Sequence, residues 1–128
     1  MHRKIALKEM EALLVELPTL VDTVLVEGPR DTEALRSMGY VGVIEVLSRT
    51  GVNDFDLSDE LASKYSQILL LLDFDEEGLN LNNHFTQLLE RKGMKVEYGL
   101  RKEFSRLMAE IGVYAIESLD NIRDDMDQ

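Results

Sequence analysis

Three carboxylates follow two apolar runs of the sequence, and their positions favour the binding of a divalent cation. Glu27 ends the run of residues 21–27, and Asp73 and Asp75 follow the run of residues 67–72. Aspartates two residues apart on an extended chain point to the same side, about 6 to 7 Å apart along it, so they can share one hard cation or hold two. Because no histidine or cysteine accompanies them, these oxygen ligands favour Mg²⁺, with Mn²⁺ as a substitute, over Zn²⁺.

Glycines stand beside these acids, and the combination suits phosphate chemistry. A divalent ion among carboxylates neutralises phosphate oxygens and orients a water or a hydroxyl. Gly28 and Gly78 would let the backbone approach a phosphate closely. In an alternative interpretation the acids only cap the helix that begins near Gly78, which accounts for one acid and leaves Glu27 unexplained.

The two acid-bearing runs must form neighbouring strands if their carboxylates are to meet. The unbroken run of residues 67–72 is typical of a strand buried on both faces, as in a parallel sheet covered by helices. Alternating strand and helix patterns predict an α/β fold with a four-stranded, mostly parallel sheet flanked by helices. The simplest strand order, 2-1-3-4, places the first and third strands side by side, with the switch point of the sheet between them. We expect strands at residues 21–27, 41–47, 67–72 and 94–98, helices at 1–17, 31–38, 57–65, 79–92 and 101–111, and a helix or an irregular segment at 113–122.

Composition limits the possible functions. The chain of 128 residues, 45% hydrophobic, predicts a single domain, with an N-terminal helix at about 1–17 and a C-terminal helical extension at about 101–128. The absence of cysteine excludes disulfides, thiolate zinc sites and cysteine nucleophiles. No apolar run approaches the roughly 20 residues that span a bilayer, and no secretory leader is evident, so we expect a cytoplasmic protein without a membrane partner. The net charge of −11 argues against broad nucleic-acid binding but allows a local basic rim.

Two motifs give the sequence a family resemblance. Glu27-Gly28-Pro29-Arg30-Asp31 and Asp73-Phe74-Asp75-Glu76-Glu77-Gly78 closely resemble the motifs of the TOPRIM domain of topoisomerases, primases and related nucleases, over residues 21–98. The resemblance implies a compact, Rossmann-like domain that uses Mg²⁺ to break or join phosphodiester bonds. It implies that Glu27 is a general acid/base or metal-linked residue and that Asp73 and Asp75 coordinate the metal. In its small size, the chain most resembles stand-alone TOPRIM proteins related to ribosomal RNA maturation nucleases.

Two functional hypotheses follow. In the first, the protein is a Mg²⁺-dependent nuclease that acts on structured RNA, with DNA as the less favoured substrate, and Glu27, Asp73 and Asp75 form its metal centre. In the second, it is a non-catalytic, metal-binding module that serves as a subunit of a larger nucleic-acid-processing complex. The complete acid set favours the first hypothesis, and the acidic composition favours the second. The residues expected to contact the substrate are Gly28, Arg30, Asp31, Arg49, Gly78, Arg101 and Lys102.

Overall fold

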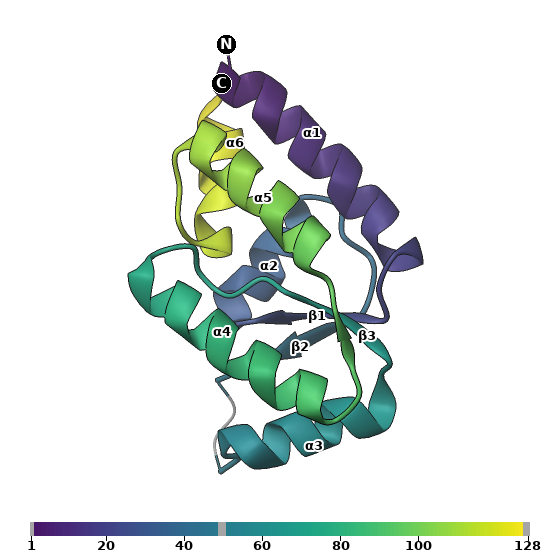
Figure 1. Ribbon diagram of the computed structural model, residues 1–128. Coiled ribbons are helices and arrows are strands. Elements are labelled where there is room, and N and C mark those ends of the chain that lie inside the picture. Colours follow the sequence, from purple (N-terminus) through teal and green to yellow (C-terminus); the bar gives the residue numbers. More distant parts are fainter. Residues whose placement is uncertain (1, 49–50, 127–128) are drawn as a thin grey trace.

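A four-stranded parallel sheet lies at the centre of the computed structural model, which describes residues 2–48 and 51–126. Its strands are β1 (Thr23–Val26), β2 (Ile44–Val46), β3 (Gln67–Leu70) and β4 (Lys95–Val96). Their order is β2-β1-β3-β4, and each neighbouring pair is parallel (Figure 1). The predicted strand order is confirmed, and the two strands that precede the acidic motifs are neighbours.

Helices cover both faces of this sheet, so the predicted α/β class is confirmed. On one face lie α3 (Asp54–Lys64) and α4 (Glu76–Arg91); on the other lie α1 (His2–Glu16), α2 (Pro29–Ser37), α5 (Tyr98–Ile111) and α6 (Leu119–Met126) (Figure 1). Short 3₁₀ turns occupy Leu17–Thr19 and Ile116–Ser118. Residues 113–122, for which two alternatives were open, therefore contain the second 3₁₀ turn and the start of α6. No helix in the described part of the chain has the length and apolar character needed to cross a membrane.

Side chains of the central strands alternate between two apolar cores, one on each face of the sheet. Val24 and Leu69 belong to the core beneath α1, α2 and α5, whereas Leu25 and Leu70 belong to the core beneath α3 and α4. All four are at most 1% exposed. Burial on both faces explains why the runs are uniformly apolar instead of alternating with polar residues.

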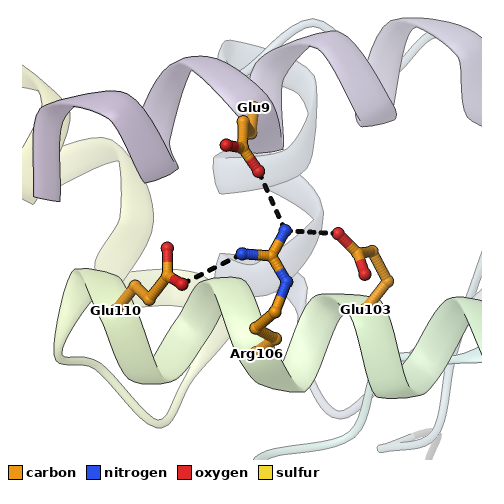
Figure 2. Close-up of polar contacts among 4 residues, drawn as sticks. All are labelled: Glu9, Glu103, Arg106 and Glu110. Carbon is orange, nitrogen blue, oxygen red and sulfur yellow. Dashed lines mark hydrogen bonds and ion pairs between the residues drawn. The ribbon is translucent and has the colours of Figure 1, made fainter. Parts of the chain in front are cut away.

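The contact between α1 and α5 combines a buried apolar seam with an exposed charged cluster. Arg106 on α5 donates hydrogen bonds to Glu9 on α1 and to Glu110 on its own helix, each at 2.9 Å, and also contacts Glu103 (Figure 2). Because all four side chains are exposed, water screens these pairs and each contributes little stability. The fully buried Met10, which shares a core with α5, shows that apolar packing holds the two helices together.

The helices that follow the acidic motifs begin earlier than the sequence predicted, at residues 29 and 76 instead of 31 and 79. Pro29 suits the first position of α2, where the missing N–H has no helical partner. Asp75 is the N-cap of α4 and accepts a hydrogen bond from the Gly78 N–H at 2.8 Å. Glu76 and Glu77 then occupy the first turn, where the helix dipole favours negative charge. The acidic stretch therefore starts the helix as well as supplying the candidate metal ligands.

Candidate metal centre

The two acidic motifs meet at the carboxyl edge of the sheet. Glu27 directly follows β1, and the chain after β3 continues beside β1, where the Leu71 N–H donates to the Leu25 carbonyl at 2.8 Å. Glu27 Oε2 accepts a hydrogen bond from the Asp73 backbone N–H at 2.7 Å. The glutamate of the first motif therefore holds the backbone of the second motif in place.

Asp73 lies in partly buried and strongly negative surroundings. Burial raises the pKa of Asp73 from 3.8 to about 7, helped by the charges of Glu27, Asp31 and Asp75 and by a side-chain hydrogen bond to Glu27. A carboxyl with this pKa is about half protonated near neutral pH, so Asp73 carries a proton in part of the molecules. A cation bound among these oxygens would take the place of that proton.

Gly78 is required by the close approach of two backbone segments. A Cβ atom at this position would lie 2.0 Å from the Asp73 carbonyl oxygen, a distance that no side chain can occupy. The residue is buried, and its N–H is engaged by Asp75. The sequence predicted that Gly78 admits a phosphate; in the structure, its missing side chain admits the loop that carries Asp73.

Gly28 differs from Gly78, because nothing in its described surroundings demands a glycine. Its backbone is extended, with φ −148°, and an added Cβ would make only ordinary contact with Ser48 Oγ at 3.8 Å. Its N–H donates to Asp31 Oδ2 at 3.0 Å. Gly28 is partly exposed beside Glu27, so an approaching ligand group could use this space.

Asp31 is an internal tie, although the sequence placed it among the residues that contact substrate. It is 4% exposed, and its second oxygen accepts a hydrogen bond from the Glu117 N–H at 2.9 Å. Burial raises the pKa of Asp31 despite its two backbone hydrogen bonds. The carboxylate therefore joins the start of α2 to the 3₁₀ turn before α6, and its charge contributes to the raised pKa of Asp73.

Arg101 is also internal, although the sequence placed it on an exposed basic rim. It is 8% exposed and donates to the carbonyls of Leu70, Leu72 and Asp73, at 3.0, 2.8 and 3.2 Å. Its guanidinium also lies 4.1 Å from the ring centroid of Phe74. Burial lowers the pKa of Arg101 to about 10, so it keeps its charge near neutral pH.

The position of Arg101 follows from the shortness of β4. The Glu97 N–H pairs with the Ile68 carbonyl, and α5 begins at the next residue, Tyr98. The carbonyls further along the edge of β3 then lack strand partners, and the Arg101 guanidinium supplies the donors instead. The sequence carries a signal for the burial of Arg101, though not for its carbonyl partners, because Arg101 stands three residues before Phe104 on the apolar stripe of α5.

The remaining basic residues of the predicted rim are not gathered into one cluster. Arg30 is exposed at the start of α2 and borders a polar pocket together with Glu33 and Glu117. Lys102 is exposed on α5. Arg49 lies outside the described residues.

The acids at this edge are suitable ligands for a hard cation, but their side chains are not arranged around a common point. Glu27, Asp73 and Asp75 offer carboxylate oxygens, the ligands that Mg²⁺ prefers, and a cation would offset the repulsion that raises the pKa of Asp73. Among the described residues, no group of three or more Asp, Glu, His or Cys side chains is arranged to hold a metal ion. Metal binding at this edge therefore requires carboxylate side chains to move closer together.

Comparisons with known proteins find a family model, relatives and a solved structure that this chain resembles. The family model of the Toprim domain matches residues 22–107. A UPF0292 protein of Thermococcus onnurineus is 35% identical over 112 residues, which cover 88% of this chain and 81% of that protein. A UPF0292 protein of Thermococcus sibiricus is 36% identical over 112 residues, or 88% and 86% of the two chains. A solved structure of a protein from Aquifex aeolicus is 26% identical, with a TM-score of 0.64 over 90% of this chain and 95% of that chain. The residues that the Toprim model matches include both acidic motifs, all four strands of the sheet and Arg101.

Proposed function

Because this chain belongs to the Toprim family, whose domains are metal-binding modules of nucleic-acid processing, we propose that it is a Mg²⁺-dependent nuclease acting on structured RNA. One observation carries the proposal. Glu27 and Asp73 meet at the carboxyl ends of adjacent strands, where burial and neighbouring acids raise the pKa of Asp73 to about 7. Perturbed acids in contact at a sheet switch point are typical of functional sites.

Each acid has a distinct role in this proposal. Asp73 and Asp75 hold Mg²⁺, or Mn²⁺ in its place, after their side chains rotate. When bound, the ion would neutralise charge on the phosphate and help to orient a water. Glu27 accepts a proton from the attacking water as the water oxygen bonds to phosphorus and the P–O bond to the leaving oxygen breaks, and the leaving oxygen takes a proton from solvent. The hydrogen bond that Glu27 accepts from the Asp73 N–H keeps it beside the second motif. The extended backbone at Gly28 leaves room for a phosphate oxygen next to Glu27.

Contacts to the nucleic-acid backbone come from the exposed basic side chains near this edge. We assign this role to Arg30 and Lys102, and also to Arg49 on the basis of the sequence. Arg101 instead acts as a positioning residue, because its donors are engaged by the backbone that leads to Asp73. A long duplex is bound mainly through many basic contacts to its phosphates. Because this protein offers few such contacts, a structured RNA that is recognised by its shape is the better substrate.

The direct test is a cleavage assay with purified protein on mixed structured RNA, single-stranded RNA and DNA. Wild-type protein should cleave RNA with Mg²⁺ or Mn²⁺ and lose this activity in EDTA. Glu27→Gln should reduce turnover by about 10² to 10⁴, since its amide cannot accept a proton, while metal binding is largely kept. Asp75→Asn should lose both metal binding and activity. Glu77→Gln, which removes one nearby exposed charge outside the proposed ligand set, is the matched control and should remain active.

A second candidate function has its own supporting observation. The lack of a ready three-ligand cluster among the described residues favours a module that binds metal weakly and works inside a larger complex. If wild-type protein cleaves none of the substrates under any metal condition, yet purifies with a stable partner, the protein is a non-catalytic module of a larger complex. Cleavage that survives Asp73→Asn together with Asp75→Asn would show that the proposed metal site is wrong.

A further inference from the structure

A pocket of about 320 Å³ opens between α4 and α5, beside the edge of β3 and just past the end of β4. Leu70 and Val96 give it an apolar floor, and Asn82 and Thr86 form its wall on α4. The Arg101 side chain, which also binds the Asp73 carbonyl, lies on the α5 side. We call this cavity the α4–α5 pocket. It is next to the acidic edge but contains none of the candidate metal ligands.

Two polar side chains that line this pocket do not form a hydrogen bond with each other. Asn82 Oδ1 and Thr86 Oγ1 are buried, and neither has a hydrogen-bond partner within the described part of the chain. Thr86 as a whole is only 6% exposed. Buried polar atoms are nearly always paired, because an unpaired one costs about 1 to 3 kcal/mol. Two such atoms, one helical turn apart on residues that line the same cavity, indicate a site built for a ligand.

Glu97 adds a third polar group to the lining. Its carboxylate is held by the Gln67 amide and by Lys95, and both of these contacts from described residues use Oε1. Oε2 is therefore available as an acceptor. The side chain is 17% exposed, so a hydrogen bond to it would form largely away from water.

The mouth of the pocket carries an aromatic ring and a cation. Tyr98 is 57% exposed and Leu79 is 46% exposed, although both are large and apolar. A side-chain hydrogen bond to Glu90 raises the pKa of Tyr98 and ties the ring on α5 to α4. Exposed, fixed aromatic rings are platforms on which bases stack. Lys102 also borders this mouth and can reach a phosphate.

We propose that the α4–α5 pocket binds a single unstacked nucleobase that carries an exocyclic amino group beside a ring-nitrogen acceptor, as adenine does, from the nucleic acid whose phosphate lies at the acidic edge. The volume lies at the low end for ligand pockets and suits one base, not an extended strand. Asn82 Oδ1 and Glu97 Oε2 accept from the amino group, and Thr86 Oγ1 donates to a ring nitrogen. Tyr98 stacks on the base or its neighbour. The inference rests on the proposed function in its choice of substrate class, although the pocket itself needs no metal.

The test uses the full chain in EDTA, so that it does not depend on catalysis. Binding of adenosine monophosphate, inosine monophosphate and ribose phosphate is measured by NMR titration. Inosine monophosphate keeps the size and charge of adenosine monophosphate but lacks the amino group, and ribose phosphate lacks the base. Adenosine monophosphate should bind at least about tenfold more tightly than either, since one well-placed polar pair discriminates by about that factor or more.

Variants then locate the bound base. Asn82→Leu and Thr86→Val should each weaken adenosine monophosphate about tenfold without lowering the melting temperature, because they remove unpaired polar atoms. Asn83→Leu makes the same change at the next, exposed residue of α4 and should leave binding unaffected. Equal affinity for the three probes, or unchanged binding in both pocket variants, would overturn the proposal. Base binding without nuclease activity would refute the proposed function alone, and cleavage with an unresponsive pocket would refute this inference alone.

Discussion

Replacing Asp73 with asparagine should stabilise the metal-free protein above neutral pH and have little effect in acid. The folded-state pKa of Asp73 is about 7, compared with an ordinary value of 3.8. The folded protein therefore holds the proton more tightly than the unfolded chain. This contribution to the free energy of unfolding is fully present below about pH 4, and it is lost as the pH rises towards 7. The asparagine amide can donate to Glu27 as the protonated carboxyl does, but it cannot acquire a charge.

The size of the effect follows from the same two pKa values. Their difference corresponds to about 4 kcal/mol. Asp73 is only partly buried, so screening by water reduces the expected gain of Asp73→Asn at pH 8 to about 2 kcal/mol. For a domain of this size, that gain corresponds to a rise in melting temperature of about 6 to 10 °C.

Urea unfolding in EDTA, followed at pH 4.5 and pH 8, measures this difference directly. Asp125→Asn, at an exposed position of α6, makes the same chemical change away from the site and serves as the control. Millimolar Mg²⁺ should stabilise wild-type protein at pH 8, because a cation relieves the repulsion only in the folded state, and should not stabilise Asp73→Asn. If wild type and Asp73→Asn have the same free energy of unfolding at pH 8, folding does not raise the pKa of Asp73 and the electrostatic description of the site is wrong.

Four further substitutions test the elements around the site by urea unfolding. Gly78→Ala should lower the free energy of unfolding by about 2 kcal/mol or more, because the added Cβ meets the Asp73 carbonyl. Gly28→Ala should lower it by about 1 kcal/mol or less. Equal losses for the two glycines would contradict their assigned roles. Arg101→Lys should cost roughly 2 to 4 kcal/mol, since an ammonium cannot reproduce the fork that reaches three carbonyls, and a neutral result would show that these bonds are dispensable. Leu71→Ala should cost roughly 2 to 5 kcal/mol as a cavity in a fully buried position, and a value under 1 kcal/mol would argue against the core assignment.

The features that could be predicted from the sequence are those set by local pattern. The apolar run through Leu69 and Leu70 identifies a strand buried on both faces, and the acid that follows each motif strand marks the carboxyl edge. Strand order followed from requiring these acids to meet, and the sheet has that order. The start of α4 was placed too late because capping by the acids was treated as an alternative to metal binding, whereas in the structure the candidate ligand Asp75 also caps α4.

The features that could not be predicted depend on where strand pairing stops and on which helices pack against each other. Nothing local to Arg101 shows that β4 stops after two residues and leaves carbonyls of β3 for a guanidinium to satisfy. The pair formed by Asn82 and Thr86 looks like any polar spacing on a helix until α5 is placed across from it. Such roles are tertiary, because each depends on segments that are far apart in sequence.

The net charge of −11 restricts how this protein can hold a nucleic acid, and the two proposed sites together meet that restriction. Affinity that comes from many Lys and Arg contacts is not available to a chain with 25 acidic and 14 basic side chains. A cation at Asp73 would offset the negative charge of Glu27, Asp31 and Asp75 and make this edge attractive for a single phosphate. The α4–α5 pocket would add contacts to a base, which carry no penalty from the surrounding acids. Arg101 joins the two sites, since it lines the pocket and binds the Asp73 carbonyl. Binding should therefore depend strongly on divalent cations and on the base presented, and only weakly on monovalent salt, because few phosphate counterions are released.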